Sequence, residues 1–180
     1  EDRFPDWDGF AAALSELVSR QLIPLARFTE VKDSERFSLL RALDFFADFG
    51  DIELWEVVRR ARWRRYPVGH HLFKKGGEGN SVHILALGSV EVVREGRVVV
   101  QLGAGTSVGE MAYLAPNPEL RKHATDVRVT EVCTSVSFTP QLIGSLSGEC
   151  QHRFDRAFIK VLVRRLHAAH EQLAHPRRIL

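Results

Sequence analysis

Hydrophobic residues in the first part of the chain recur at helical spacing. Phe10, Leu14, Leu17 and Val18 stand at i, i+4, i+7 and i+8, so they share one face of an amphipathic helix. Pro24 interrupts this stretch, because proline removes a backbone donor and clashes with the preceding turn.

Two further helices are expected before residue 62. Asp33 and Ser34 offer N-cap oxygens for the first, which we expect to continue until Gly50. Gly50 and Asp51 end that helix and cap the second. The apolar positions of the two helices are Phe37, Leu40, Leu43, Phe45, Phe46, Ile52, Leu54, Trp55, Val57 and Val58.

From about residue 63 to residue 139 the pattern changes to short β-branched runs separated by glycine. The runs are 82–87, 90–93, 98–102, 127–129 and 132–138. The step 94–97, Arg-Glu-Gly-Arg between two valine runs, predicts a hairpin turn. Many short strands with glycine turns indicate a sandwich or barrel rather than a parallel sheet.

Helical spacing returns after Pro140. It predicts a helix of about six turns that begins near Gln151 and stops at Pro176. Its apolar stripe is Phe154, Phe158, Val161, Leu162, Leu166, Ala169 and Leu173. The fold class predicted is α+β, mainly β, with helices at both ends of the sheet.

Composition narrows the class of protein. The 180 residues suit one domain with a helical extension, and 44% apolar residues can fill a core. A net charge of +2 gives no global field for nucleic acid, and the short apolar runs predict no transmembrane helix.

No signal-peptide pattern opens the chain, and its start at Glu1 suggests that upstream residues are missing. Cys133 and Cys150 cannot make a disulfide framework, so we expect reduced thiols and a cytoplasmic location.

Candidate chemistry is concentrated between Gly105 and Thr125. Gly109 allows the backbone to approach a ligand closely, and the helix formers from Glu110 to Leu114 predict one short helical turn. Free N–H groups at such a turn bind anions, while a buried Glu110 carboxylate accepts hydrogen bonds from sugar hydroxyls. A basic side chain about a dozen residues later can neutralise a phosphate. Together these features suit a ligand with one phosphate and a ribose.

The order of these motifs resembles that of the cyclic nucleotide-binding domain family over 49–166. The motifs are 49–55, Tyr66-Pro67-Val68-Gly69, the turn 76–80, the strand ending at Gly88, Leu102-Gly103 with Gly105, Gly109-Glu110-Met111-Ala112 and Ala124-Thr125. The resemblance implies an eight-stranded antiparallel β-roll, jelly-roll-like, with a phosphate-binding cassette. It divides the chain into an N-terminal helical extension (1–48), the β-roll (49–150) and a C-terminal lid or dimer helix (151–180).

The same resemblance implies the site. In the family, the cassette glutamate binds the ribose 2′-hydroxyl, the next amides hold the phosphate, and an arginine two residues before an alanine pairs with the phosphate. That position is Lys122 here, and lysine cannot make the planar fork of a guanidinium. Strand alternation is expected to send the neighbouring Arg121 to the opposite face. The predicted ligand-binding residues are Val108, Gly109, Glu110, Met111, Ala112, Arg121, Lys122, His123, Ala124 and Thr125.

Two details bear on the ligand. Val108 stands where the family usually has phenylalanine, and His123 stands where some members that prefer cyclic GMP have threonine. The second difference favours cyclic AMP.

Glu110 and Lys122 also have an interpretation without a ligand. Glu110 would then be a carboxylate at a helix start that binds no ligand, and Lys122 a solvated strand residue.

Other charged clusters have simpler interpretations. The arginines between 59 and 65 could touch nucleic acid or an acidic partner, or could be a solvated helix end. The C-terminal helix is also basic and includes Arg164 and Arg165. The sequence to Leu180 holds no winged helix of the kind that family transcription factors have, so we expect no DNA binding by this chain alone.

No catalytic or metal constellation is expected. His167 and His170 lie at i, i+3 without a carboxylate set, so no metal site is predicted there. A cupin-type metalloenzyme would need a His-x-His pair, whereas His70 and His71 are adjacent and point to opposite faces of a strand.

The sequence therefore predicts a cytoplasmic sensor of a cyclic nucleotide, cAMP before cGMP, that is not an enzyme and has no cofactor. It would signal through the C-terminal helix to an effector protein or a missing upstream domain, and that helix offers a seam for a homodimer. The alternative is a degenerate roll that no longer binds nucleotide and serves as an interaction or dimerisation module.

Overall fold

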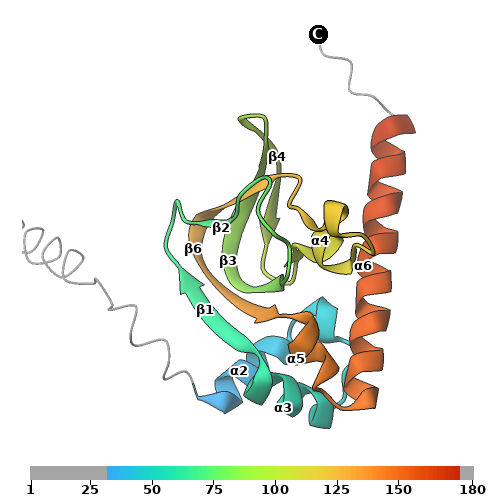
Figure 1. Ribbon diagram of the computed structural model, residues 1–180. Helices are drawn as coiled ribbons and strands as arrows, with labels where there is room; N and C mark the ends of the chain where they lie inside the picture. The colour runs from blue at the N-terminus through green and yellow to red at the C-terminus, as the bar shows by residue number, and fades with distance from the viewer. Residues whose placement is uncertain (1–31, 175–180) are drawn as a thin grey trace, which may run out of the picture. The chain divides into compact units, whose positions relative to one another are not determined.

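An antiparallel sheet forms the centre of the fold, which the computed structural model describes for residues 32–174 (Figure 1). Its strands are β1 (Arg62–Tyr66), β2 (His71–Phe73), β3 (Val82–Arg94), β4 (Arg97–Gly103), β5 (Ser107–Val108) and β6 (Asp126–Phe138). The order is β1-β6-β3-β4, with β2 also on β6 and β5 on β3. The predicted helical face from Phe10 to Val18, Pro24, and the stop at Pro176 lie outside the described residues.

The described part of the chain, 32–174, holds six strands, so the expectation of eight is wrong. The long strands β3 and β6 have 13 residues each and pair with one another along their length, with register shifts between Leu85 and Val90. Gly88 lies at this bend with φ +79°, and a Cβ there would stand 2.3 Å from the Val132 carbonyl oxygen. The runs that the sequence separates on either side of the bend are therefore halves of one bent strand, in β3 and again in β6.

The hairpin between β3 and β4 is confirmed. Arg94 pairs with Arg97, and the two residues between them both have left-handed backbone, Glu95 with φ 53° and Gly96 with φ 75°. Two successive residues with positive φ are the requirement of a type I′ turn, which matches the twist of the flanking strands.

Helices flank the sheet at both ends of the chain. They are α2 (Asp33–Arg41), α3 (Asp51–Arg60), α4 (Glu110–Leu114), α5 (Pro140–Gly144) and α6 (Gly148–Ala174), with 3-10 turns η2 (Asp44–Phe46) and η3 (Pro118–Arg121). The expected continuous helix up to Gly50 is wrong, because Leu43 is extended and separates α2 from η2. The expected caps at Asp33 and Ser34 are also wrong, since Lys32 is the N-cap and makes no side-chain bond.

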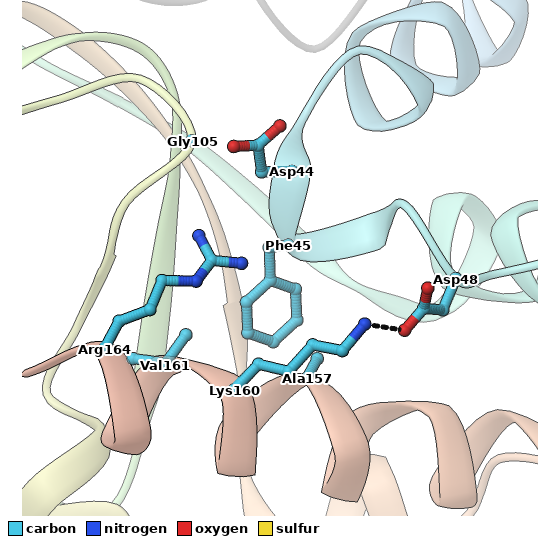
Figure 2. A pocket seen from close by; sticks show the side chains of 8 residues that line it. All are labelled: Asp44, Phe45, Asp48, Gly105, Ala157, Lys160, Val161 and Arg164. Atoms are coloured by element: carbon cyan, nitrogen blue, oxygen red, sulfur yellow. Dashed lines mark hydrogen bonds and ion pairs between the residues drawn. The ribbon is translucent and has the colours of Figure 1, made fainter.

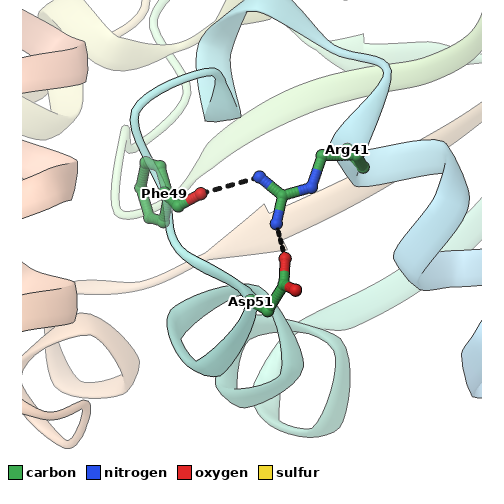
Figure 3. Close-up of polar contacts among 3 residues, drawn as sticks. All are labelled: Arg41, Phe49 and Asp51. Atoms are coloured by element: carbon green, nitrogen blue, oxygen red, sulfur yellow. Dashed lines mark hydrogen bonds and ion pairs between the residues drawn. The ribbon is translucent and has the colours of Figure 1, made fainter.

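The start of α3 is tied to the end of α2 by one side chain. Arg41 donates to the Phe49 carbonyl oxygen at 2.8 Å and forms an ion pair with Asp51 (Figure 3). The guanidinium thus holds the backbone just before α3 and an acidic side chain in its first turn, where the helix dipole favours negative charge.

Two hydrophobic clusters fill the fold. One lies inside the roll and includes Leu85, Val90, Val129 and Cys133. The other joins the helices to the sheet, and its aromatic centre is Phe45, Phe46, Phe49, Phe138, Phe154 and Phe158. Both cysteines are free and buried, as predicted.

The long helix α6 begins three residues earlier than predicted. Ser147 Oγ accepts a hydrogen bond from the Cys150 amide at 3.3 Å, which caps the helix before Gln151. Lys160 pairs with Asp48, and beside them Asp44, Phe45, Gly105 and Arg164 line a small pocket (Figure 2). Among residues 32–174, no helix is long and apolar enough to cross a membrane.

Candidate functional site

A tight turn between β5 and α4 begins the candidate site. Gly109 has φ +86°, and a Cβ there would lie 2.7 Å from the Phe73 ring and 3.0 Å from the Ser81 carbonyl oxygen. Only glycine fits this backbone without strain. The short helix predicted after it is confirmed as α4, whose first turn closes with a hydrogen bond from the Tyr113 amide to the Gly109 carbonyl oxygen at 3.0 Å.

Glu110, the first residue of α4, is completely buried. Its Oε1 forms an ion pair with Arg165 of α6, whose Nη2 also donates to the Ser107 carbonyl oxygen at 2.6 Å. Burial raises the pKa of Glu110, and the Arg165 charge opposes that shift. Glu110 Oε2 and Ser107 Oγ are buried without a well-placed hydrogen-bond partner, so the site holds polar atoms that a ligand could satisfy.

Arg165 is a residue of the candidate site that sequence reasoning missed. The sequence placed it among the basic residues of the C-terminal helix and gave it no role. It lies seven residues after Phe158 and four after Val161, which puts it on the stripe that faces the core. A lone arginine on a buried stripe needs a charged partner, and that was the available signal.

Ala112 of α4 and Arg121 of η3 both pack against the turn at 76–80. A Cβ on Gly79 would lie 2.1 Å from Ala112 Cβ and 2.7 Å from the Arg121 carbonyl oxygen. The Gly79 amide donates to that same carbonyl at 2.6 Å. Glycine at 79 thus lets α4 and the end of η3 approach one another, while the Met111 side chain is exposed.

Arg121 and Lys122 are arranged differently from the prediction. Arg121 ends the 3-10 turn η3, and its Nε donates to the Ala115 carbonyl oxygen at 3.2 Å. Lys122 is exposed and its backbone bridges Glu78, while β6 starts only at Asp126. The expected strand alternation between the two basic residues is therefore wrong, because the chain is still in a turn at this point.

His123 packs on Phe73, the aromatic residue beside the turn at Gly109. Its ring is buried and stacked on Phe73, with ring centroids 4.0 Å apart. Its backbone donates to the Gly77 carbonyl and accepts from the Gly76 amide, at 2.9 and 2.8 Å. The next two predicted site residues, Ala124 and Thr125, are exposed and half-buried in the bend before β6. The structure therefore brings Val108, Gly109 and His123 together at Phe73, with Glu110 and Ala112 in the helix that follows Gly109, while Arg121 and Lys122 are exposed.

Comparison with known proteins agrees with this geometry. Residues 63–146, which run from β1 to just after α5, match the family model described as cyclic nucleotide-binding domain. The part of the chain that forms the β-roll is therefore similar to the cyclic nucleotide-binding domain family.

Individual relatives extend this result. A cyclic nucleotide-gated potassium channel of Rhizobium etli is 34% identical over 96 residues, which is 53% of this chain and 26% of the channel. The chain thus spans about a quarter of the length of this curated relative.

Two solved structures share the fold. A cyclic nucleotide-binding domain from Methylobacillus flagellatus aligns with a TM-score of 0.67 at 15% identity, covering 79% of this chain and 82% of that one. Thermus thermophilus catabolite activator protein aligns with a TM-score of 0.61 at 21% identity, covering 72% and 61%.

A second buried histidine, His83, lies beside the turn at Gly109. His83 pairs in the sheet with Val108, its Nδ1 lies 3.0 Å from Ser135 Oγ, and its ring meets Phe73 edge to face at 5.1 Å. Burial lowers the pKa of His83 to about 4, and the nearby Arg64 and His123 act in the same direction. Its place on a β-strand gave no signal that separated it from an ordinary strand histidine.

Metal binding has no support in the part of the chain from 32 to 174. No group of three or more His, Cys, Asp or Glu side chains there is arranged around a common point. His70, one of the two histidines weighed as a cupin ligand, stacks on Tyr66 with ring centroids 4.9 Å apart.

Proposed function

We propose that this domain is a sensor that binds a cyclic nucleotide, cAMP in the first place, in the cassette that begins at Gly109. The observation that carries the proposal is the buried Glu110 carboxylate, whose Oε2 has no hydrogen-bond partner. A buried acceptor without a donor is destabilising, and a ribose hydroxyl supplies the missing donor. The proposed activity is binding and regulation rather than catalysis.

The phosphate would be held by the amides of Met111 and Ala112 together with Lys122. Lys122 is exposed at the rim, so it can reach a ligand that lies over α4, but it offers one point charge instead of a bidentate fork. Lys122→Arg should therefore tighten binding of cAMP by roughly tenfold, which is about one additional charge-assisted hydrogen bond. Arg121→Lys is the matched control, because Arg121 already donates to a backbone carbonyl and is not placed at the phosphate.

Selectivity for cAMP would follow from His123. Its ring is buried against Phe73 and presents no hydroxyl at the position where members that prefer cyclic GMP have threonine. A series of melting curves with cAMP, cGMP and a cyclic dinucleotide tests this directly. Binding at a hundredfold excess over the dissociation constant raises stability by roughly 2.7 kcal/mol, so cAMP should give the largest increase in Tm and His123→Thr should favour cGMP.

The output of the sensor would pass through α6. The helix contacts the cassette through Arg165 and the core through Phe154 and Phe158, so it can report on both. Beyond the core it exposes an apolar stripe at Ile159, Leu162, Val163 and Leu166, which suits a homodimer or an effector. The channel relative, of which this chain covers a quarter, supports an effector in a longer protein. The two free cysteines support a cytoplasmic location.

A degenerate interaction module is the second candidate, and one observation favours it. Arg165 already pairs with Glu110, which leaves that side chain no exposed surface. If none of the three nucleotides changes Tm for the wild type or for Lys122→Arg at millimolar concentration, the sensor proposal is wrong and the module is the better description.

A further inference from the structure

Four exposed arginines gather where helix α3 ends and strand β1 begins. They are Arg59, Arg60, Arg62 and Arg64. In the described part of the chain, none of the four forms an ion pair. Arg59 lies over the Trp55 ring, with its Cζ 6.0 Å from the ring centroid. This surface therefore carries four positive charges that no carboxylate of the described residues neutralises.

The end of the helix accounts for only two of these charges. Arg59 and Arg60 lie in the last turn of α3, where the helix dipole favours positive charge. Arg62 and Arg64 lie in β1, beyond the last turn, where the effect of the dipole has fallen off. Their partners across the sheet, on β6, are both serines. The neighbouring strand therefore offers the two strand arginines no acidic side chain.

Strand β1 has one edge without a partner strand among the described residues. It stands at the end of the sheet order and pairs only with β6 (Figure 1). Such an edge presents backbone groups to which an extended chain can add. Arg62 and Arg64 are two residues apart, which places both side chains on one face of β1, roughly 7 Å from one another. Two carboxylates at the same spacing on an added strand would lie opposite the two arginines.

Nucleic acid also suits a basic surface, but the aromatic side chains here are not free to stack on bases. Trp63, between the two strand arginines, is half-buried and packs against the core that joins the helices to the sheet. Trp55 is half-buried as well and stacks on Phe37, with ring centroids 4.7 Å apart. Proteins that bind single-stranded nucleic acid combine a basic groove with exposed rings. An acidic peptide therefore fits this surface better.

We propose that the free edge of β1, with Arg62 and Arg64 on it and Arg59 and Arg60 beside it, is a docking site for an extended acidic segment of a partner protein. The segment adds to the sheet as a further strand. Backbone hydrogen bonds to β1 hold it, and carboxylates at every second residue select it. The site shares no residue with the cassette and needs no nucleotide, so it is independent of the proposed function.

Two labelled heptapeptides test the spacing of the carboxylates. The probe is TTETETT, whose binding to the full 180-residue chain is measured by fluorescence anisotropy. Its two glutamates face the same side of a strand. The control peptide TTEETTT has the same composition and charge, but its adjacent glutamates face opposite sides. We expect the control to bind severalfold more weakly, because only one of its carboxylates can meet an arginine.

Two double variants test the arginines. Arg62→Gln with Arg64→Gln should bind TTETETT roughly tenfold more weakly, the effect of losing two exposed ion pairs. Arg94→Gln with Arg97→Gln is the matched control, because it removes the same charge from exposed residues of the hairpin between β3 and β4. This control should bind like the wild type. Circular dichroism should show that both variants are folded.

Methylated peptides test whether the segment adds as a strand. In an antiparallel pair, only alternate residues turn their N–H groups toward the neighbouring strand. One version of TTETETT carries N-methyl groups on its two glutamates, and the other carries them on the threonines beside and between them. One version should lose binding, and the other should bind nearly as well as the unmethylated peptide.

Several results would overturn the proposal. They are equal binding of the two heptapeptides, equal effects of the two methylation patterns, or unchanged binding by Arg62→Gln with Arg64→Gln. If the wild type does not bind TTETETT at millimolar concentration, the proposal is also wrong, and the arginines only keep the strand edge from pairing with other chains. Tighter binding of a labelled oligothymidylate, reduced in the same double variant, would make this a nucleic-acid site instead. None of these results depends on whether the cassette binds cAMP.

Discussion

A single methyl group at Gly79 should separate the two halves of the candidate site. A Cβ at this position would stand 2.1 Å from Ala112 Cβ and 2.7 Å from the Arg121 carbonyl oxygen. Both neighbours are fixed, one by the short helix α4 and the other as the acceptor of the Gly79 amide. The strain cannot be relieved by a rotation of a side chain, so α4 and the segment around Lys122 must move apart.

We expect Gly79→Ala to lower the free energy of unfolding by about 1–3 kcal/mol, the usual cost of overpacking. For a domain of this size that is a fall in Tm of roughly 2–4 °C per kcal/mol. Binding of cAMP, measured by calorimetry below the melting range, should weaken as well, because the carboxylate side and the phosphate side of the site no longer fit one ligand.

Gly103→Ala is the matched control for this experiment. Gly103 ends β4, has no positive φ, and a Cβ there would meet nothing within 4 Å. The control should melt at or slightly above the wild type, because alanine reduces the entropy of the unfolded chain. If Gly79→Ala were as stable as Gly103→Ala and bound nucleotide equally well, the close packing of α4 on the 76–80 turn would be refuted.

Three further predictions concern other parts of the molecule. The pKa of His83 is about 4 in the folded protein and 6.5 in the unfolded chain, so the unfolded chain takes up a proton first as pH falls. The free energy of unfolding should therefore fall by about 3 kcal/mol between pH 6.5 and pH 4. Urea denaturation of His83→Gln at the same pH values should not show this fall. Burial raises the pKa of Cys133 to about 11 and that of Cys150 to about 12. Neither thiol should therefore react with a thiol reagent at pH 8 until urea unfolds the chain. Rapid labelling of the native protein would contradict the burial of the two thiols. Leu162→Asp should leave Tm nearly unchanged, since Leu162 is 39% exposed, but it should abolish a homodimer measured by light scattering. Val98→Asp, on the exposed strand β4, is the control and should leave the homodimer intact. A molecular mass that Leu162→Asp does not change would show that this face of α6 is not the dimer interface.

Local features of the fold were predictable from the sequence because they depend on neighbouring residues. The hairpin turn follows from the Arg-Glu-Gly-Arg step at 94–97, and the short helix α4 follows from the glycine and the helix formers after it. The strand count failed because bends in β3 and β6 are held by cross-strand pairing. No local pattern shows whether a glycine such as Gly88 ends a strand or bends it.

The site was predictable in part for the same reason. The turn at Gly109 and the burial of Glu110 match the prediction made from the resemblance and the local pattern. The contact between Glu110 and Arg165 joins residues 55 positions apart, and it depends on how α6 lies against the roll. Arg121 and Lys122 were misplaced because the turn η3 extends the connection and delays the start of β6.

The most direct test of the account is a calorimetric titration of the wild type and Glu110→Ala with cAMP. We expect measurable binding of cAMP by the wild type and an affinity roughly tenfold to a hundredfold lower in Glu110→Ala. This is the effect of removing one partner of a charge-assisted hydrogen bond. Circular dichroism should show both proteins folded. Equal affinities for the two folded proteins, or no heat from the wild type at millimolar cAMP, would contradict the claim that Glu110 is the ribose acceptor of a nucleotide sensor.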